Sequence, residues 1–435
     1  MKIAILGFGV EGHLAYDHWN DSENQITICD QSESIIIPDH APSKLGPNYL
    51  DNLKSFDLIV RSPSLHPNDI VKANGPEILD KVTTTTNEFF KLSPSKNIIG
   101  VTGTKGKGTT STLLTKLLEA SGHRVHLGGN VGNGAMDLLK NDIQADDWVV
   151  LELSSFQLID LKRSPHIAVC LMVAPEHLNW HQDMDEYVSA KANIFVNQTY
   201  SDIAIYYAQN EYSKQLAEAS SGIKIPYFEA PGAYVDNGEV IISEQTICRT
   251  DELKLIGQHN WQNVCAALTA FWRVSQNIEV AHSVITSFLG LEHRLELVRE
   301  FNGIKYYNDS FASAPTATIA AIEAINGSKV LIIGGFDRNI GLNDLAQSIK
   351  NHEFEIKSVI LVGASRLRVS ESLQNVDFNN YKISDSKSMK EIVNFSSSLA
   401  GPNDSVVLSP GFPSFDMFKN FEDRGLQFKE VVNSL

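Results

Sequence analysis

The sequence has few of the features that mark secreted, membrane-spanning or nucleic-acid-binding proteins. Its four cysteines are far apart in 435 residues and form neither a CxxC pair nor a disulfide framework, so we expect buried thiols in a reducing compartment. No apolar run is long enough to cross a bilayer. With 36 Lys and Arg against 52 Asp and Glu, the net charge of −16 opposes non-specific nucleic-acid binding. We therefore expect a cytoplasmic protein that binds neither membranes nor nucleic acids.

Internal repeats and long low-complexity tracts are also missing, and strands alternate with helices along the chain. A Thr-rich stretch at 83–86, followed by a Ser-Pro-Ser turn at 93–95, is typical of a connection between domains. Because 435 residues exceed what one hydrophobic core usually serves, two or three domains are expected. With a second boundary near residues 291–294, we predict three, at residues 1–93, 94–292 and 293–435. Each is expected to be α/β, with a mostly parallel sheet flanked by helices. The expected strands are 2–6, 25–29, 57–60, 97–102, 148–153, 167–172, 203–206, 330–333, 358–362 and 405–408, and the expected helices include 109–120 and 260–274.

A glycine-rich loop with two lysines separates the strand expected at 97–102 from the helix expected at 109–120. Its glycines allow backbone N–H groups to converge on phosphate oxygens, the helix N-terminus adds a partial positive charge, and Lys107 supplies a mobile cation. Val101 and Gly108 depart from the general P-loop pattern, so we expect Thr109 to hold the Mg²⁺. The alternative is a flexible glycine turn before a helix. We predict an ATP site formed by Gly103, Thr104, Lys105, Gly106, Lys107, Gly108 and Thr109.

A second feature of this predicted site is Glu152, which interrupts the apolar strand expected at 148–153. A charged residue in a buried strand is costly unless it is paired or metal-bound. An ATP-binding loop also needs a carboxylate near its metal, at the end of a neighbouring strand. We therefore favour Glu152 as a Mg²⁺ ligand over a salt-bridged structural acid.

The N-terminal strand runs into another glycine-rich loop, in which Gly7, Gly9 and Gly12 have the GxGxxG spacing, and Asp30 ends the next strand. This meets the dinucleotide fingerprint in motif and in context. Alone it would favour a dehydrogenase. The loop indicates only that a pyrophosphate can approach a helix N-terminus. With an ATP loop in the next domain, a UDP-linked substrate is a simpler interpretation than a redox cofactor.

Together these motifs resemble the Mur ligase superfamily, and within it the ligases that join glutamate to UDP-N-acetylmuramoyl-alanine. The resemblance covers essentially the whole chain, and its most specific part is the C-terminal stretch 414–425. The matching segments are the two glycine loops, 128–132, 151–158, 176–181, Lys191, 257–260, 293–294, 308–310, 408–410 and 414–425.

The resemblance implies three domains that bind UDP, ATP and the amino acid in turn, and it implies a mechanism. The substrate carboxylate attacks the γ-phosphate of ATP to give an acyl phosphate, which the amine of glutamate then attacks. The implied cofactors are ATP and two Mg²⁺ ions, and Lys191 is a candidate for carbamylation, which turns a cation into an anion able to bind Mg²⁺. Without the resemblance, Lys191 would be interpreted as a surface lysine on a helix.

Residue roles follow from the resemblance position by position. The implied catalytic residues are Lys107, Glu152, His177 and Lys191, and the implied metal ligands are Thr109, Glu152, His177 and Lys191. Besides the phosphate loop, ATP is expected to contact Asn263, Arg294 and Asp309. The UDP-linked substrate is expected at Gly7, Gly9, Gly12, Asp30, Asn130 and Ser154, and glutamate at Arg338, Ser414 and Phe421. The expected partners are therefore UDP-N-acetylmuramoyl-L-alanine, glutamate and ATP, bound by a protein that we expect to be monomeric.

His177 and His181 stand four residues apart, the spacing of a zinc pair on a helix. The acidic residue precedes the first histidine instead of following it, and Pro175 and Asn179 fit a loop. We therefore expect His181 to be a structural histidine with satisfied hydrogen bonds, and not a ligand.

One segment departs from the family pattern. The usual Asp-Ser-Lys-Ala-Thr here begins Asp309-Ser310-Phe311, so Phe311 replaces a lysine on the amino-acid side of the site. A ligase class that adds L-glutamate to the same acceptor also lacks this lysine, and folylpolyglutamate synthases share the Gly-Lys-Gly step. We favour the addition of D-glutamate. The alternatives are the L-glutamate-adding ligase, a folylpolyglutamate synthase-type ligase, and a nucleotide-binding regulator or redox protein without ligase chemistry.

Overall fold

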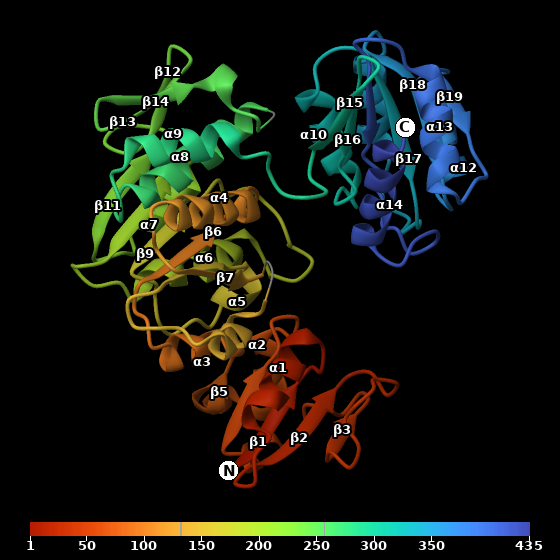
Figure 1. Cartoon of the computed structure of the whole chain (residues 1–435). Coiled ribbons are helices and arrows are strands. Elements are labelled where there is room, and N and C mark those ends of the chain that lie inside the picture. The colour runs from red at the N-terminus through yellow and green to blue at the C-terminus, as the bar shows by residue number, and fades with distance from the viewer. Residues whose placement is uncertain (131–132, 256) are drawn as a thin grey trace. The chain divides into compact units, whose positions relative to one another are not determined.

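The computed structural model describes residues 1–130, 133–255 and 257–435, so Val131 and Gly132 of the 128–132 motif lie outside the described residues. The chain forms two compact units, Met1–Glu252 with Trp261–Thr286, and Leu253–Asn260 with Ser287–Leu435. Among the described residues, the first unit carries three sheets and the second carries one (Figure 1). Within those ranges, every helix is too short or too polar to cross a membrane.

The first sheet, drawn in red in Figure 1, is parallel throughout, with the strand order β3-β2-β1-β4-β5. Both of its faces are buried: Ile3 and Ile5 pack on one face, and Ala4 and Leu6 on the other. Such continuous apolar strands are typical of a parallel sheet covered on both sides. Its strands are β1 (Lys2–Leu6), β2 (Gln25–Asp30), β3 (Ser43–Leu45), β4 (Leu58–Arg61) and β5 (Val82–Thr83), and its helices are α1 (Val10–Trp19), η1 (Leu53–Ser55), α2 (Pro67–Asn74), η2 (Pro76–Lys81) and α3 (Thr85–Leu92).

The Thr-rich stretch expected to connect two domains folds as β5 and the start of α3. The Thr84 side chain caps α3 by accepting a hydrogen bond from the backbone N–H of Asn87. Phe89 and Phe90 of α3 pack into the core of the second sheet, beside Ile98. The connection is therefore a buried helix that packs on the central sheet.

The second sheet is also parallel, with the order β11-β10-β9-β6-β8-β7. Val101 of β6 pairs with Glu152 of β8, so the phosphate loop and Glu152 leave the sheet at the same edge. The strands are β6 (Ile98–Thr102), β7 (Val125–Gly129), β8 (Trp148–Glu152), β9 (Ile167–Cys170), β10 (Ile203–Tyr207) and β11 (Ile223–Tyr227). The helices are α4 (Lys107–Ala120), η3 (Ala135–Asn141), α5 (Ser155–Leu158), α6 (Met184–Val196), α7 (Glu211–Ala217), α8 (Gln258–Phe271) and α9 (Ile278–Ser287).

A small antiparallel sheet was not expected from the sequence. It consists of β12 (Tyr234–Asp236), β13 (Glu239–Ile242) and β14 (Gln245–Arg249), followed by η4 (Thr250–Glu252). Asn237 and Gly238 form the first turn with φ values of +49° and +79°. Asn-Gly between two strands is a strong hairpin signal, and this signal was missed.

The fourth sheet has the order β15-β16-β20-β17-β18-β19, in which only β15 is antiparallel to its neighbour among the pairs described. Apolar side chains cover both faces. Its strands are β15 (Glu296–Phe301), β16 (Ile304–Asn308), β17 (Lys329–Gly334), β18 (Ile356–Val362), β19 (Tyr381–Ile383) and β20 (Ser405–Leu408), and its helices are α10 (Pro315–Ala324), α11 (Asn343–Asn351), α12 (Arg366–Gln374), α13 (Met389–Leu399) and α14 (Phe421–Asn433). The prediction of an α/β fold with mostly parallel sheets flanked by helices is confirmed, and all four cysteines are buried and free.

Candidate active site

The phosphate loop follows β6 and ends in the first turn of α4, which also carries the half-buried Thr109. Gly106, the N-cap of α4, has φ +86°, and a Cβ there would lie 2.1 Å from Oδ1 of Asn263. Gly103 has φ +145°, and its Cβ would lie 2.6 Å from Cβ of Leu171. Both positions therefore require glycine. The loop backbone presses against Asn263, so this expected ATP contact does lie beside the loop.

Two lysine ammonium groups meet at one carbonyl of the loop. The carbonyl oxygen of Gly103 lies 3.1 Å from Lys107 Nζ and 3.0 Å from Lys191 Nζ. Lys191 is only 1% exposed, so it is not a surface lysine. Burial, reinforced by the charge of Lys107, lowers the pKa of Lys191 to about 7. Near neutral pH a large share of Lys191 is therefore an uncharged amine, which is the form that can react as a nucleophile.

Glu152 ends β8 with its carboxylate buried. Oε1 accepts a hydrogen bond from Nδ2 of Asn130 at 2.9 Å, whereas Oε2 has no hydrogen-bond partner within the described ranges. A buried carboxylate oxygen without a partner is costly. A cation at this oxygen would remove that cost, so the residue fits the expected metal ligand. Ser154, two residues further on, directs its hydroxyl to Oε1 of Gln157 at 3.0 Å.

His177 lies in the loop between β9 and α6, and its φ of +59° is in the left-handed region. Non-glycine residues in this region are strained, and such strain is concentrated at functional sites. Burial lowers the pKa of His177, Glu176 opposes the shift, and Lys107, Lys191 and Lys105 reinforce it. The imidazole is therefore held in its neutral form, which is the form that binds metals. Lys105 itself lies 3.4 Å from Glu176 as an ion pair.

Two of the three glycines of the N-terminal loop are required, for different reasons. Gly7 has φ +84°, and a Cβ there would lie 2.8 Å from Cβ of Ser62. At Gly12 a Cβ would lie 2.2 Å from the carbonyl oxygen of Gly7, so the close approach of α1 to β1 requires glycine. At Gly9, the N-cap of α1, a Cβ would meet nothing within 4 Å. The open side of the loop is thus at Gly9, where an anion can approach the helix N-terminus.

Two carboxylates beside this loop are engaged by the protein itself. Asp30, expected at the uridine end, accepts a hydrogen bond from the backbone N–H of Phe8 at 2.7 Å, so it also fixes the loop. Glu11 accepts a hydrogen bond from the Thr85 hydroxyl. Burial raises the pKa of Glu11, although the bonds from Thr85 and Gln157 act in the opposite direction.

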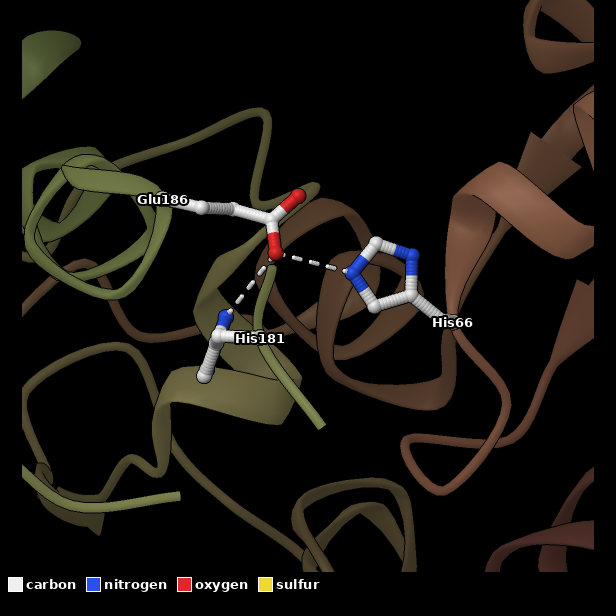
Figure 2. Close-up of side chains that lie close together, drawn as sticks. All are labelled: His66, His181 and Glu186. Carbon is white, nitrogen blue, oxygen red and sulfur yellow. Dashed lines mark hydrogen bonds and ion pairs between the residues drawn. The ribbon is translucent and has the colours of Figure 1, made fainter. Parts of the chain in front are cut away.

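Two charged clusters were not expected from the sequence. They join the first sheet to the part of the same unit that is built on the second sheet, which we call the central part. Arg61 pairs with Asp160, and His66 and His181 converge on Glu186 (Figure 2). His181 is buried as expected, and its Nε2 lies 2.9 Å from the Ser155 hydroxyl. Its Nδ1, however, has no hydrogen-bond partner in the part of the chain that is described. Among these residues, His181 is therefore hydrogen-bonded at Nε2 alone, and its Nδ1 faces Oε2 of Glu186 at 3.5 Å.

In the second unit, Asp309 follows β16 as a buried carboxylate. It accepts hydrogen bonds from the Ser409 hydroxyl at 2.7 Å and from the backbone N–H of Leu295 at 3.1 Å. Burial raises its pKa to about 7, despite these bonds and the nearby charge of Arg294. The Arg294 guanidinium lies 3.8 Å from the centre of the Phe311 ring. Phe311, which replaces the family lysine, therefore contacts an expected ATP-binding residue.

The three expected glutamate-binding residues follow β17 and β20, which are neighbours in the fourth sheet. Arg338 is exposed, and its loop is held by Arg368, which donates hydrogen bonds to Asp337 at 2.5 Å and to Asn339 at 3.1 Å. Ser414 is buried, and its hydroxyl has no hydrogen-bond partner among the described residues. The third residue, Phe421, packs its ring edge-on against Phe311 at 5.1 Å.

Two parts of the chain match known protein families. Residues 101–271 match the family model of the Mur ligase middle domain, and residues 293–412 match that of the Mur ligase, glutamate ligase domain. The UDP-N-acetylmuramoylalanine–D-glutamate ligase of Clostridium kluyveri is 38% identical over 450 residues, which cover 100% of the chain and 97% of the relative. The chain belongs to the Mur ligase family.

Solved structures support the fold of this Mur ligase. The UDP-N-acetylmuramate-alanine ligase MurC from Thermotoga maritima has a TM-score of 0.60 at 17% identity, covering 100% of this chain and 99% of that one. FolC from E. coli, solved with DHPP and ADP, has a TM-score of 0.57 at 18% identity and covers 80% of this chain and 92% of that one. At these identities the likeness establishes the fold alone.

The expected site residues of this Mur ligase fall into three groups by position. The phosphate loop, Asn130, Glu152, Ser154, Lys191 and Asn263 gather at the carboxyl edge of the second sheet, and His177 joins them electrostatically. Gly7, Gly9, Gly12 and Asp30 lie at the carboxyl edge of the first sheet. Arg294, Asp309, Arg338, Ser414 and Phe421 belong to the second unit.

Proposed function

We propose that this Mur ligase joins D-glutamate to UDP-N-acetylmuramoyl-L-alanine, with cleavage of ATP to ADP and phosphate, in the synthesis of peptidoglycan precursors. The observation that carries the proposal is the meeting of Lys107 and Lys191 at the Gly103 carbonyl, in the same site as Glu152 with its unpartnered Oε2. A relative that covers the whole chain is named as a D-glutamate ligase of this acceptor.

In the first step, the carboxylate of the acceptor attacks the γ-phosphorus of ATP, and ADP leaves. Lys107 and the loop N–H groups 103–109 hold the phosphate charge, with Asn263, Arg294 and Asp309 as further nucleotide contacts. Glu152 and Thr109 offer oxygen ligands, and His177 a nitrogen ligand, for Mg²⁺, which neutralises phosphate charge when bound. We propose two ions, with a carbamate on Lys191 as a ligand that supplies oxygen.

The acceptor is placed by groups at two sheet edges. The pyrophosphate of UDP meets the N-terminus of α1 at the open side of Gly9, with Gly7 and Gly12 shaping the loop and Asp30 at the uridine end. Asn130 and Ser154 hold the muramoyl-alanine end beside Glu152. The carboxylate is thereby directed to the phosphate loop. These assignments place the UDP-binding domain at residues 1–93 and the ATP-binding domain at 94–292.

In the second step, the amine of D-glutamate attacks the carbonyl carbon of the acyl phosphate, and phosphate leaves as the amide forms. The guanidinium of Arg338 pairs with a glutamate carboxylate, and glutamate gives a hydrogen-bond partner to the Ser414 hydroxyl, which has none among the described residues. Phe421 supplies an apolar wall. We assign these groups to the amino-acid-binding domain, residues 293–435.

Two other substrates compete with this proposal. L-glutamate on the same acceptor is favoured by Phe311 in place of lysine, and a folate acceptor by the Gly-Lys-Gly step at residues 106–108. The test is ATP-dependent product formation, measured by mass spectrometry, with UDP-N-acetylmuramoyl-L-alanine plus D-glutamate, the same acceptor plus L-glutamate, and a folate plus L-glutamate. We expect product with D-glutamate. Product only in another arm, or in none, would contradict the proposal.

A further inference from the structure

The segment that links β4 to α2, residues 61–66, is fastened at both ends to the central part of the first unit. At the first end, the Arg61 side chain is 0% exposed and donates to the Asp160 carboxylate from Nε at 2.7 Å and from Nη2 at 2.8 Å. Nη2 also donates to the Phe156 carbonyl at 3.0 Å, and Nη1 donates to the Leu65 carbonyl at 2.7 Å. One buried guanidinium therefore ties the segment both to itself and to α5.

At the second end, His66 Nε2 lies 3.1 Å from Oε2 of Glu186, and His181 Nδ1 lies 3.5 Å from the same oxygen (Figure 2). The His66 ring packs against Trp180 with a centroid distance of 4.4 Å. The indole N–H of Trp180 donates to the Ser64 carbonyl at 2.9 Å. We call the three residues His66, His181 and Glu186 the clasp.

The hydrogen bonds of His66 decide what kind of cluster the clasp is. The three side chains each offer one possible metal-ligand atom, and these atoms lie within 4.8 Å of one another, as in a metal site. However, Nδ1 of His66 accepts a hydrogen bond from the backbone N–H of Asn68 at 3.1 Å. The ring proton is therefore on Nε2, which donates a hydrogen bond to Glu186. A metal-bound histidine needs the reverse, a lone pair toward the ion and the other N–H on an acceptor. The clasp is therefore a hydrogen bond between His66 and Glu186, with His181 Nδ1 facing the same carboxylate oxygen, and it is not arranged as a metal site.

The 61–66 segment contacts the N-terminal glycine loop directly and is linked to His177 through Phe156. On one side, Ser62 packs so closely on the N-terminal glycine loop that a Cβ at Gly7 would lie 2.8 Å from the Ser62 Cβ. On the other side, the Phe156 ring, whose carbonyl Arg61 holds, lies 4.8 Å from the His177 ring and 4.8 Å from the Trp180 ring. Packed groups thus run without a break from the glycine loop to His177.

We propose that the 61–66 segment and the clasp position the two substrates of the ligase relative to each other, with Glu186 acting through His66. This inference rests on the proposed function, in which the acceptor reaches from the loop at Gly9 to the γ-phosphate. The reacting atoms must come within about 3–3.5 Å, and a misplacement of about 1 Å costs on the order of 100-fold in rate. Loosening the clasp displaces the acceptor carboxylate while the phosphate loop keeps its own contacts.

The direct test is Glu186→Gln, which keeps the shape of the side chain and removes its charge. We expect kcat to fall about 10-fold and the KM for ATP to stay unchanged. His66→Gln should give a similar loss, and the double variant should lose no more than Glu186→Gln alone, because that variant has already lost the His66–Glu186 contact. Additive losses, a raised KM for ATP in either variant, or full activity in Glu186→Gln would overturn the proposal.

A matched control is Asp69→Asn, which breaks the exposed Lys72–Asp69 ion pair on α2 and should leave kcat unchanged; an equal loss there would overturn the proposal. Hydrogen exchange without substrates gives a second measurement. In Glu186→Gln, amides at 62–66 and 7–12 should exchange faster, and those of α14 should not change. Unchanged exchange at 62–66 would overturn the clasp.

The failure of this inference can be told apart from that of the proposed function. Wild-type protein without ligase activity would overturn the proposed function and the ligase role of the clasp together. Active wild-type protein with unaffected variants would overturn the clasp alone. Elemental analysis provides a further check. If the wild type bound one zinc ion per chain and Glu186→Gln bound none, the three residues would be a metal site and the clasp would be overturned.

Discussion

The proposed phosphate site of the first unit and the proposed amino-acid site of the second each lie at the carboxyl edge of a mostly parallel sheet, but their groups are held in different ways. At the phosphate site, the buried Lys191 and Glu152 are held by the Gly103 carbonyl and by Asn130 before any ligand arrives. At the amino-acid site, Arg338 is exposed and the Ser414 hydroxyl has no hydrogen-bond partner within the described residues. The charged groups of the proposed phosphate site are therefore preorganised by protein contacts, whereas Arg338 of the proposed amino-acid site is exposed. Each site also holds one buried polar atom without a hydrogen-bond partner among the described residues, Oε2 of Glu152 and the Ser414 hydroxyl.

The largest effect is expected from removal of Lys107, the mobile cation of the proposed phosphate site. Lys107→Ala is expected to lower kcat about 1,000-fold, because the charge that stabilises the transferring phosphoryl group is lost. The measurement is phosphate release with all substrates saturating. Lys116→Ala, an exposed lysine of the same helix, is the control and should keep full activity. Activity above a tenth of wild type in Lys107→Ala would refute the phosphate-loop assignment.

Glu152→Gln separates function from stability at the preorganised site. We expect kcat to fall about 100-fold and the Mg²⁺ concentration for half-activity to rise, because a metal ligand is lost. Since Oε2 of Glu152 has no partner in the described structure, the thermal midpoint should not fall. Thermal unfolding and a Mg²⁺ titration of activity check both parts. A large drop in the midpoint would show that Glu152 is a structural acid.

At the amino-acid site, Arg338→Ala should act on one substrate alone. We expect the KM for D-glutamate to rise about 30-fold, corresponding to about 2 kcal/mol for a charge-assisted hydrogen bond. The KM for ATP should not change, because the phosphate site is organised independently. Steady-state kinetics with each substrate varied gives both values, with Lys390→Ala on α13 as the exposed control. Equal effects on both KM values would erase the distinction between the sites.

The remaining prediction concerns the dependence of stability on pH. Folding raises the pKa of Asp309 from 3.8 to about 7. Between these two pH values the folded protein keeps a proton on Asp309 that the unfolded chain has released. The burial of protonated Asp309 therefore contributes fully to the free energy of unfolding below pH 3.8, and this contribution is lost as the pH rises through 7. Asp309→Asn should remove that loss. Urea unfolding followed by circular dichroism at several pH values tests this; an unaltered pH profile in the variant would contradict the burial argument.

Local patterns were enough to predict the phosphate loop, the strands β1, β6, β8, β17 and β20, and Glu152. These signals lie within about ten residues of one another, where glycine spacing and apolar runs act directly. The short strands β3 and β19 and the antiparallel strand β15 were missed because their residues are partly or fully exposed and follow no clear period, and β5 was missed because it has only two residues.

The clusters that join the first sheet to the central part were missed for a different reason. Arg61 and Asp160 are 99 residues apart, and His66 and Glu186 are 120 apart, so no local pattern connects them. One signal was present, because Arg61 ends the apolar strand β4 just as Glu152 ends β8. The reasoning that singled out Glu152, that a buried charge needs a partner, applies equally to Arg61.

The central claim is that the preorganised phosphate site uses ATP to activate the acceptor carboxylate. The most direct measurement labels both carboxylate oxygens of UDP-N-acetylmuramoyl-L-alanine with ¹⁸O and follows the label during turnover with D-glutamate. Attack of the carboxylate on the γ-phosphorus transfers one of these oxygens to the phosphate that leaves when the amide forms. We predict one ¹⁸O in each phosphate released. Phosphate without ¹⁸O, formed together with the amide product, would contradict the account.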